Sequence, residues 1–259
     1  MFIDTHAHYD DEAFDADRDD VILNAHKDGA EIIINAAQDF RTSVKCIELA
    51  RKFEFMYAAV GVHPHEAGNV LPGDIEKIAG LAADEKVVAI GEAGLDYHYN
   101  FSEPEVQKKI FRENIDLSKS IGKPIVVHDR EAHADVLNIM TESGIKSGGA
   151  VIHCFSGSAE MAKVVASKGW HFSVGGAVTF KNARRIIEAL AVIPDDLLML
   201  ETDCPYMTPE PFRGRRNDSS YIQYTARRIA EIKGISYEAL CGISNNNAKR
   251  FFGILPKKA

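Results

Sequence analysis

Two histidines, His6 and His8, lie two residues apart at the end of an apolar run in the opening stretch "MFIDTHAHYD". Successive side chains of a strand point to opposite faces, so these two imidazoles would point to the same side. An isolated H-x-H pair is more often incidental than a metal site. The pair therefore indicates chemistry only if similar residues recur at equivalent places in the chain.

Similar residues do recur directly after other apolar runs. They are His63 and His65 in "VGVHPH", Glu92 in "AIGEAGLDY", His128 in "IVVHDR", His153 in "VIHCFSG", and Glu201 and Asp203 in "LMLETDCPY". Burying such groups is costly unless they are paired or coordinated, and imidazoles with carboxylates are typical metal ligands. His26 and His133 fall in expected helices and His171 begins an expected strand, so we interpret these three as structural or surface residues.

The elements that must position these residues alternate along the chain. Short apolar runs rich in Val and Ile predict strands at residues 2–6, 31–36, 55–62, 87–91, 124–128, 149–153, 171–178 and 197–201. Stretches with helical spacing, such as "DRDDVILNAHKDGA", lie between them, and several end at a glycine typical of a C-terminal cap: Gly29, Gly122, Gly144 and Gly169. This alternation implies parallel pairing, because each crossover needs a dozen or more residues.

The number of units points to a closed architecture. Eight strand–helix units in 259 residues match the size of a (β/α)8 barrel. We predict a TIM-like barrel as a single domain over residues 1–259, with an extra C-terminal helix at about 236–252. A doubly wound sheet is the alternative, but no G-x-G-x-x-G follows the first strand. A barrel would gather the candidate residues, since the carboxyl ends of its strands meet at one end.

Composition and charge narrow the class of protein. The net charge of −8 argues against a broad basic face for duplex DNA. The four cysteines are scattered without C-x-x-C spacing and are interpreted as reduced thiols. No apolar stretch approaches the ~20 residues that span a bilayer, and the N-terminus does not resemble a signal peptide. We expect a cytoplasmic protein with no membrane association and no obligate protein partner.

The chain resembles the TatD family of metal-dependent hydrolases, a branch of the amidohydrolase superfamily. The motifs "DTHAH", "GVHPH", "AIGEAGLDYH", "PIVVHDREA", "IHCFSG" and "ETDCPYMTP…RGRRN" stand in the family's order and spacing. After "RRN", where the family has an acidic residue and proline, this chain has Asp218 and Ser219. The resemblance implies a distorted TIM barrel with one or two divalent metal ions and phosphodiesterase activity on nucleic acid. Family members are typically described as deoxyribonucleases with 3′-to-5′ exonuclease action on single strands.

The resemblance leads to a specific set of expected metal ligands. His6, His8 and Asp203 would form one metal site and His128 and His153 a second, with Glu92 bridging the two. Such mixed ligands suit zinc, manganese, iron or cobalt, and the resemblance keeps magnesium and manganese among the candidates. We expect two divalent ions per chain, with Asp203 as the general base and Glu92 as the second catalytic residue. Glu201 is left out of the ligand set and is expected to hold a histidine or an arginine in place.

Contacts to the substrate are predicted in the surrounding loops. We expect His63, His65, Arg215, Arg216 and Tyr97 to contact it, while Arg213 belongs to a solvated loop. Tyr99 and Phe101, like Tyr97, offer rings on which bases of a single strand can stack. The predicted function is a metal-dependent 3′-to-5′ exonuclease of single-stranded DNA or RNA. A hydrolase of a small amide, lactone or phosphoester and a barrel that binds metal or nucleic acid without turnover are the alternatives.

Overall fold

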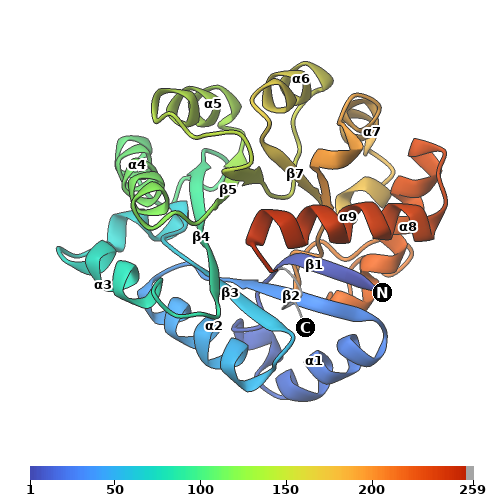
Figure 1. The fold of residues 1–259 in the computed structure, drawn as a ribbon, viewed down its shortest axis with the longest axis horizontal. Coiled ribbons are helices and arrows are strands. Elements are labelled where there is room, and N and C mark those ends of the chain that lie inside the picture. The colour runs from blue at the N-terminus through green and yellow to red at the C-terminus, as the bar shows by residue number, and fades with distance from the viewer. Residues whose placement is uncertain (255–259) are drawn as a thin grey trace.

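Eight parallel strands form the centre of the protein in a computed structural model that describes residues 1–254. The strands are β1 (Phe2–Ala7), β2 (Ala30–Ala36), β3 (Met56–Val60), β4 (Val87–Asp96), β5 (Ile125–Arg130), β6 (Ala150–Ile152), β7 (His171–Val174) and β8 (Leu198–Leu200). Each strand pairs with the next in sequence order, and Ala7 forms a bridge with Cys204 where the first and last strands meet. The sheet is therefore a nearly closed barrel (Figure 1), which confirms the predicted (β/α)8 fold.

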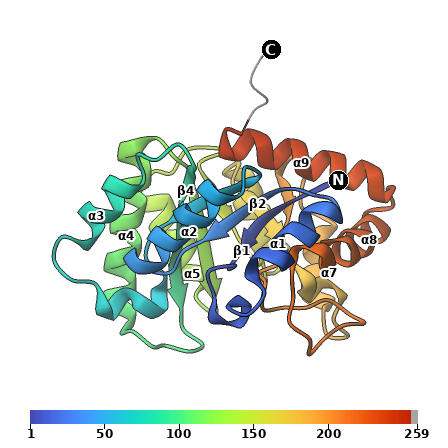
Figure 2. The same cartoon turned by 90° about the horizontal axis from the view of Figure 1, so that it is seen from below.

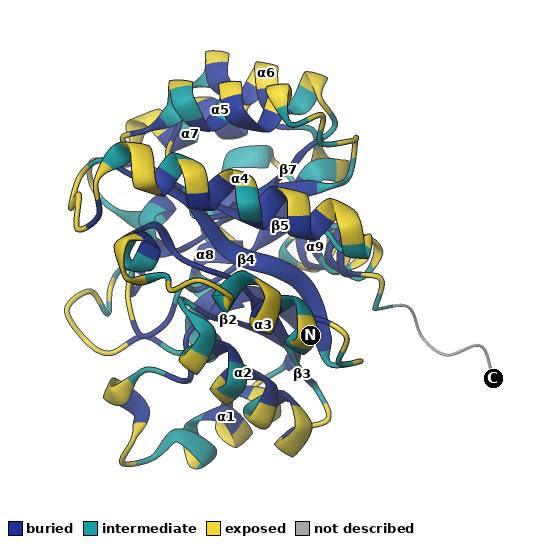
Figure 3. Cartoon of the chain, turned by 90° about the vertical axis from the view of Figure 1, so that its left-hand side faces the viewer, coloured by how far each residue is buried: buried dark blue, intermediate teal, exposed yellow. Residues whose placement is uncertain are grey.

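The helices cover the barrel and turn their buried faces toward it (Figure 3). They are α1 (Arg18–Lys27), α2 (Phe40–Lys52), α3 (Asp74–Leu81), α4 (Pro104–Ile121), α5 (His133–Glu142), α6 (Ala159–Ser167), α7 (Arg184–Leu190), α8 (Ile222–Lys233) and α9 (Tyr237–Phe252). The helix α4 illustrates how the sequence specifies such a helix. Pro104 occupies its first turn, Ile110 and Ile115 are buried, and Gly122 ends it with a φ of 69°. None of the helices in the described part of the chain is long and apolar enough to cross a membrane.

The strand β4 extends further than the sequence pattern predicts, to Asp96 instead of residue 91. Glycines inside a strand weaken it, so "GEAG" reads as the start of a loop. The structure instead uses Gly94 for a close approach of two backbones: a Cβ there would lie 2.0 Å from the carbonyl oxygen of His128. The extension of β4 carries Glu92 and Asp96 alongside β5.

Two buried layers support the barrel. One fills the space between strands and helices, and the other fills the barrel interior with residues such as Ile34, Val126 and Met199. Phe251 and Phe252 of α9 belong to the interior layer, so this helix covers the amino end of the strands. Figure 2 shows α9 along one end of the barrel and the long loop after β8 at the other. The extra C-terminal helix is thus confirmed, while residues 255–259 of the predicted single domain lie outside the described residues.

Candidate metal centre

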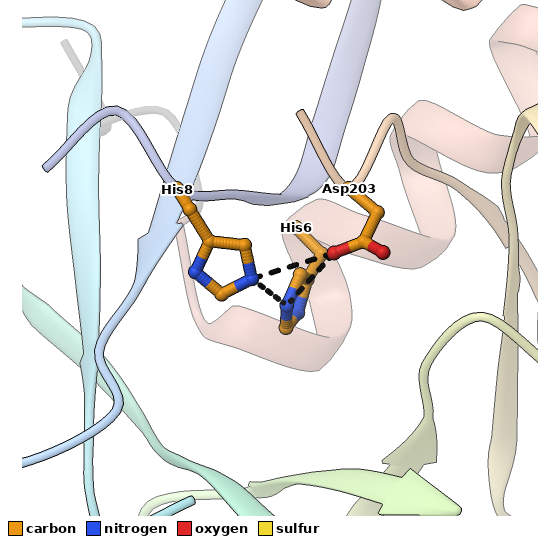
Figure 4. Close-up of side chains that lie close together, drawn as sticks. All are labelled: His6, His8 and Asp203. Carbon is orange, nitrogen blue, oxygen red and sulfur yellow. Dashed lines mark hydrogen bonds and ion pairs between the residues drawn. The ribbon is translucent and has the colours of Figure 1, made fainter. Parts of the chain in front are cut away.

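The first cluster of candidate ligands joins the end of β1 to the segment after β8 (Figure 4). The Nε2 atoms of His6 and His8 lie 3.8 and 3.4 Å from Oδ1 of Asp203 and 3.1 Å from each other. His6 belongs to β1 and His8 follows the strand directly. Because side chains two positions apart in extended backbone point to the same side, both imidazoles face Asp203. The structure therefore brings together the three residues expected to form one metal site.

A network of buried hydrogen bonds holds Asp203 in this position. The backbone N–H of Asp203 donates to the carbonyl of His6 (2.9 Å), and Asp203 has a left-handed φ of 59°. Before it, Thr202 donates from its backbone (3.0 Å) and its hydroxyl (2.6 Å) to the carboxylate of Asp4. The hydroxyl of Ser219 also donates to Asp4 (2.6 Å), a bond that the proline expected there could not make. Asp4 thus ties three distant segments together beneath the ligands.

The carboxylate of Glu92 lies between two groups of histidines. Its Oε2 faces the first cluster, 3.2 Å from His6 and 3.5 Å from His8. Its Oε1 faces a second cluster and lies 2.6, 2.7 and 3.4 Å from the nearest nitrogens of His128, His153 and His63. One oxygen toward each group is the arrangement that a bridging carboxylate requires. The proximity of His63 was not anticipated, because the sequence analysis placed it among the substrate contacts.

The far side of two of these rings, those of His8 and His128, faces another acceptor. Nδ1 of His8 donates to the carbonyl of Ala36 (2.9 Å), and Nε2 of His128 lies 3.1 Å from Asp96. Metal-binding histidines usually present one nitrogen to the metal and the other to such a partner, which fixes the ring and its tautomer. The sequence analysis missed Asp96, although its position four residues after Glu92 in one strand puts both on the same face.

Glu201 occupies the corresponding position behind His153. Its Oε1 accepts from the backbone N–H of Cys154 (2.5 Å), and its Oε2 lies 3.7 Å from Nδ1 of His153. That Oε2 and the Nδ1 atoms of His153 and His6 are buried without a hydrogen-bond partner among the described residues. Glu201 thus lies behind a histidine, and its exclusion from the ligand set stays a prediction.

Two carboxylates of the centre, Glu92 and Asp203, have lowered pKa values. Burial would raise the pKa of Glu92, but the charges of His153, His63 and His6 hold it well below its usual range. Burial acts in the same direction on Asp203, and the contact with His8 again lowers its pKa. Both groups can therefore bind a cation or accept a proton at neutral pH.

The histidines respond to the same charges in different ways. Burial would lower the pKa of His8, but its contact with Asp203 and the charge of Glu92 raise it to about 9. For His63, burial dominates and lowers the pKa to about 4. The negative charge of the buried carboxylates must be balanced, either by protons on the surrounding histidines or by divalent cations.

The donor set fits metal ions. Three groups of ligand atoms lie within 4.8 Å of one another: His6, His8 and Asp203; His63, Glu92 and His128; and His6, His153 and Glu201. Imidazole with carboxylate oxygen suits first-row divalent metals. Glu92 belongs to the second group and lies 3.2 Å from His6 of the first, so these two groups of possible ligands adjoin each other.

A cavity of about 380 Å³ opens beside the second cluster. His128, His153 and Asp203 form one wall, and Arg130, Arg185 and Phe180 belong to the loops that surround it. The cavity therefore combines ligands of the centre with two cations and an aromatic ring, in a volume suited to a small molecule or one unit of a polymer.

The other predicted substrate contacts occupy varied places. His65 lies against the centre, with Nε2 2.8 Å from Asp96. Tyr97 donates its hydroxyl to Asp135 (2.6 Å), and Arg216 forms a two-point ion pair with Asp17. The guanidinium of Arg215 lies 5.5 Å from the ring of Phe212. Of these, only His65 contacts the residues of the centre, and the roles of all remain predictions.

A (β/α)8 barrel with histidines and carboxylates gathered toward the carboxyl ends of its strands is an architecture that can hold metal ions for hydrolysis. Residues 3–253 match the model of the family described as TatD related DNase. The uncharacterized metal-dependent hydrolase YabD of Bacillus subtilis is 44% identical over 254 residues, covering 98% of this chain and all of that protein. The chain belongs to the TatD-related DNase family.

Two further relatives extend the comparison. The protein named 3′-5′ ssDNA/RNA exonuclease TatD of Escherichia fergusonii is 33% identical over 247 residues, covering 93% of this chain and 95% of that one. The crystal structure of YjjV, a TatD homologue of Escherichia coli, superposes with a TM-score of 0.91 at 27% identity and covers 98% of each chain. The chain is therefore similar over almost its whole length to a protein named a metal-dependent hydrolase, to a protein named an exonuclease and to a TatD homologue of known structure.

Proposed function

We propose that this protein is a 3′-to-5′ exonuclease of single-stranded DNA or RNA that works as a single domain with two divalent ions, magnesium, manganese or zinc. The observation that carries the proposal is the position of Glu92, with one carboxylate oxygen toward each of two ligand clusters. The name of the Escherichia fergusonii relative supports the choice of substrate. When bound, the ions would offset the charge of the scissile phosphate and lower the pKa of a water molecule.

The chain's own residues would carry the proton in this reaction. Asp203 is ionised, lines the cavity and lies next to both histidines of the first cluster, so it can accept the proton of the attacking water. His65 faces Asp96 and has its side chain only partly buried, so it can donate to a phosphate oxygen at the edge of the centre. Arg130 and Arg185 line the cavity beside them and can bind phosphate in a two-point fashion.

The dimensions of the site favour a strand end over a duplex. The cavity holds about 380 Å³ and is walled by loops, which suits one nucleotide better than a continuous double helix. The net charge of −8 also leaves little basic surface to follow a duplex backbone. A terminal nucleotide entering the cavity would place its phosphate beside the two clusters.

The test compares substrates side by side with and without chelator. Linear single-stranded DNA, RNA, circular single-stranded DNA, duplex DNA and a small phosphodiester are incubated with the protein in the presence of Mn²⁺, Mg²⁺ or Zn²⁺. The proposal expects release of mononucleotides from free 3′ ends of linear single strands, lost on chelation. Equally fast cleavage of the circle, or turnover of a small ester or amide but of no oligonucleotide, would overturn it.

A further inference from the structure

The exposed aromatic side chains of this protein gather at the end of the barrel that carries the candidate metal centre. Tyr99, Phe101 and Tyr206 are 53%, 69% and 50% exposed and are the exposed aromatic residues of the described chain. The ring centroid of Tyr206 lies 6.3 Å from that of His8. The other two follow β4 on the opposite side of the centre, next to His65. Large exposed rings concentrated around a reaction centre indicate a binding surface.

Tyr99 and Phe101 form one continuous surface beside the second ligand cluster. Their rings are stacked, with centroids 5.5 Å apart and an angle of 27° between planes. The ring of His65 meets both edge-on, at 5.5 and 4.8 Å, and lies 6.2 Å from the ring of His128. The guanidinium of Arg130 lies 5.9 Å from the ring of Tyr99, and the same arginine lines the cavity.

The loop that carries these rings is fixed to the centre by hydrogen bonds. The carboxylate of Asp96 accepts from the backbone N–H of Tyr99 (2.8 Å) with one oxygen and faces His65 and His128 with the other. At the far end of the loop, the buried side chain of Gln107 donates to the carbonyl of Ser102 (2.7 Å). The rings are therefore exposed on a loop that is held at both ends, which reduces the entropy lost on binding.

We propose that Tyr99 and Phe101 form a stacking platform for a base of the single strand whose terminal nucleotide is cleaved. The proposal rests on the proposed function, because it assigns a place to the polymer next to the cavity. Every base has a π-face, so stacking binds a strand without reading its sequence, and an arginine beside the rings adds a phosphate contact. A small amide or ester bound in the cavity would not need to contact these two rings.

The first experiment measures binding apart from hydrolysis. The double variant Tyr99→Leu/Phe101→Leu keeps apolar bulk but removes both rings, and the exchange Tyr99→Phe/Phe101→Tyr keeps them. Tyr57→Leu is the matched control, because that ring also lies near a cation (Lys86, 4.8 Å) but belongs to the start of β3, at the opposite end of the barrel. Anisotropy of a labelled single strand on chelated protein should show about five- to hundredfold weaker binding for the leucine double variant alone.

The second experiment tests whether the rings contact a base. A set of oligonucleotides carries one abasic nucleotide at successive distances from the 3′ end. At one position the missing base should weaken binding to the original protein but not to the leucine double variant. Removal of the base and removal of the rings eliminate the same contact, so their effects should not add. Tyr99→Trp adds a second tryptophan to a chain whose only one, Trp170, is buried, and its emission should be quenched by the strand but not by the matching abasic strand.

The outcomes separate this proposal from the proposed function. Equal binding by the leucine double variant, or an abasic effect of full size in it, overturns the platform. Failure of the original protein to bind a single strand also overturns it. If the strand binds through the rings but is not hydrolysed, the platform stands and the exonuclease proposal falls.

Discussion

His153 lies between two carboxylates, with Nε2 2.7 Å from Oε1 of Glu92 and Nδ1 3.7 Å from Oε2 of Glu201. The rings of His153 and His6 are stacked 3.9 Å apart, so their orientations depend on each other. A carboxylate behind a ligand fixes which nitrogen faces the metal and makes that nitrogen a better ligand. We therefore predict that Glu201 acts on the centre through His153 and does not contact a metal or substrate.

Glu201→Gln should weaken metal binding without unfolding the protein. The glutamine oxygen can still accept from Cys154, whereas the charge behind His153 is lost. Loss of such a partner typically lowers metal affinity about 10–100-fold. Titration calorimetry of chelated protein with Mn²⁺ or Zn²⁺ measures this, with Glu113→Gln on α4 as the control. An unchanged affinity would show that Glu201 has only a structural role.

Glu92→Ala and Asp203→Asn should have different consequences. The first removes the carboxylate shared by both clusters, so bound metal and turnover should fall together. The second keeps the size of the side chain and removes the base, so turnover should fall by roughly 10²–10⁴-fold, more than metal content. Metal analysis and kcat are measured on the same preparations. A loss of less than tenfold for Asp203→Asn means that another group accepts the proton.

Metal removal should lower thermal stability as well as activity. A ligand that binds only the folded state at about 100 times its Kd adds about 2.7 kcal/mol, which corresponds to a rise in Tm of about 5–10 °C for a chain of this size. Chelation should reverse the rise, and His6→Ala/His8→Ala should reduce it. The same Tm for chelated and metal-loaded protein would contradict the idea that these clusters hold metal.

Two pairs of arginines should differ in their effect on strand binding. Arg130 and Arg185 line the cavity, whereas Arg216 is paired with Asp17 and Arg215 is its neighbour. Each phosphate contact contributes roughly −0.7 to the slope of log K against log salt for single strands, and we expect one to three such contacts. Arg130→Ala/Arg185→Ala should flatten this slope at unchanged metal content. If Arg215→Ala/Arg216→Ala flattens it instead, the loop after β8 binds the phosphates, as the sequence suggested.

His171 should make the protein less stable in mild acid. Its ring lies 5.0 Å from that of Phe251, and neither ring nitrogen has a hydrogen-bond partner among residues 1–254. Burial, with Arg250 nearby and only partly offset by Asp196, lowers its pKa to about 4. The unfolded chain, with a pKa of about 6.5, takes up the proton first, so stability falls as pH drops from about 6.5 toward 4.

The comparison of His171→Phe with the original protein isolates this effect. Denaturant unfolding at pH 7 and pH 5 gives the difference in free energy for each. The original protein should lose about 2 kcal/mol more than the variant between these values, because all other titrating groups are shared. The same pH dependence in both would show that the ring is protonated in the folded state.

The pattern of strands followed by polar residues was enough to predict the barrel and most of its centre. The candidate ligands lie at or near the ends of the apolar runs, and closure of the sheet in sequence order brings these positions together, so local periodicity carries long-range information. Asp96 was missed because the glycines of "GEAG" interrupt the β pattern, and only the contact of Gly94 with His128 explains them. With β4 continued, alternation from Glu92 would have identified Asp96.

The partners of the loop side chains could not be predicted from the sequence. Arg216 pairs with Asp17, some 200 positions earlier, and Tyr97 turns to Asp135 on α5. Neither partner is implied by any spacing, since both depend on how loops fold over the finished barrel. The position of His63 follows from the barrel itself. Its closeness to Glu92 results from the pairing of β3 with β4 and is not implied by its own motif.

The meeting of β1 with the segment after β8 has a consequence for how the protein is made. Asp203, the backbone partner and neighbouring carboxylate of His6, lies 197 positions later in the sequence. A growing chain therefore has the two imidazoles and the neighbouring Glu92 long before it has Asp203. For the exonuclease proposed above, with Asp203 as its base, we expect no cutting until residue 203 has been synthesised and has joined β1.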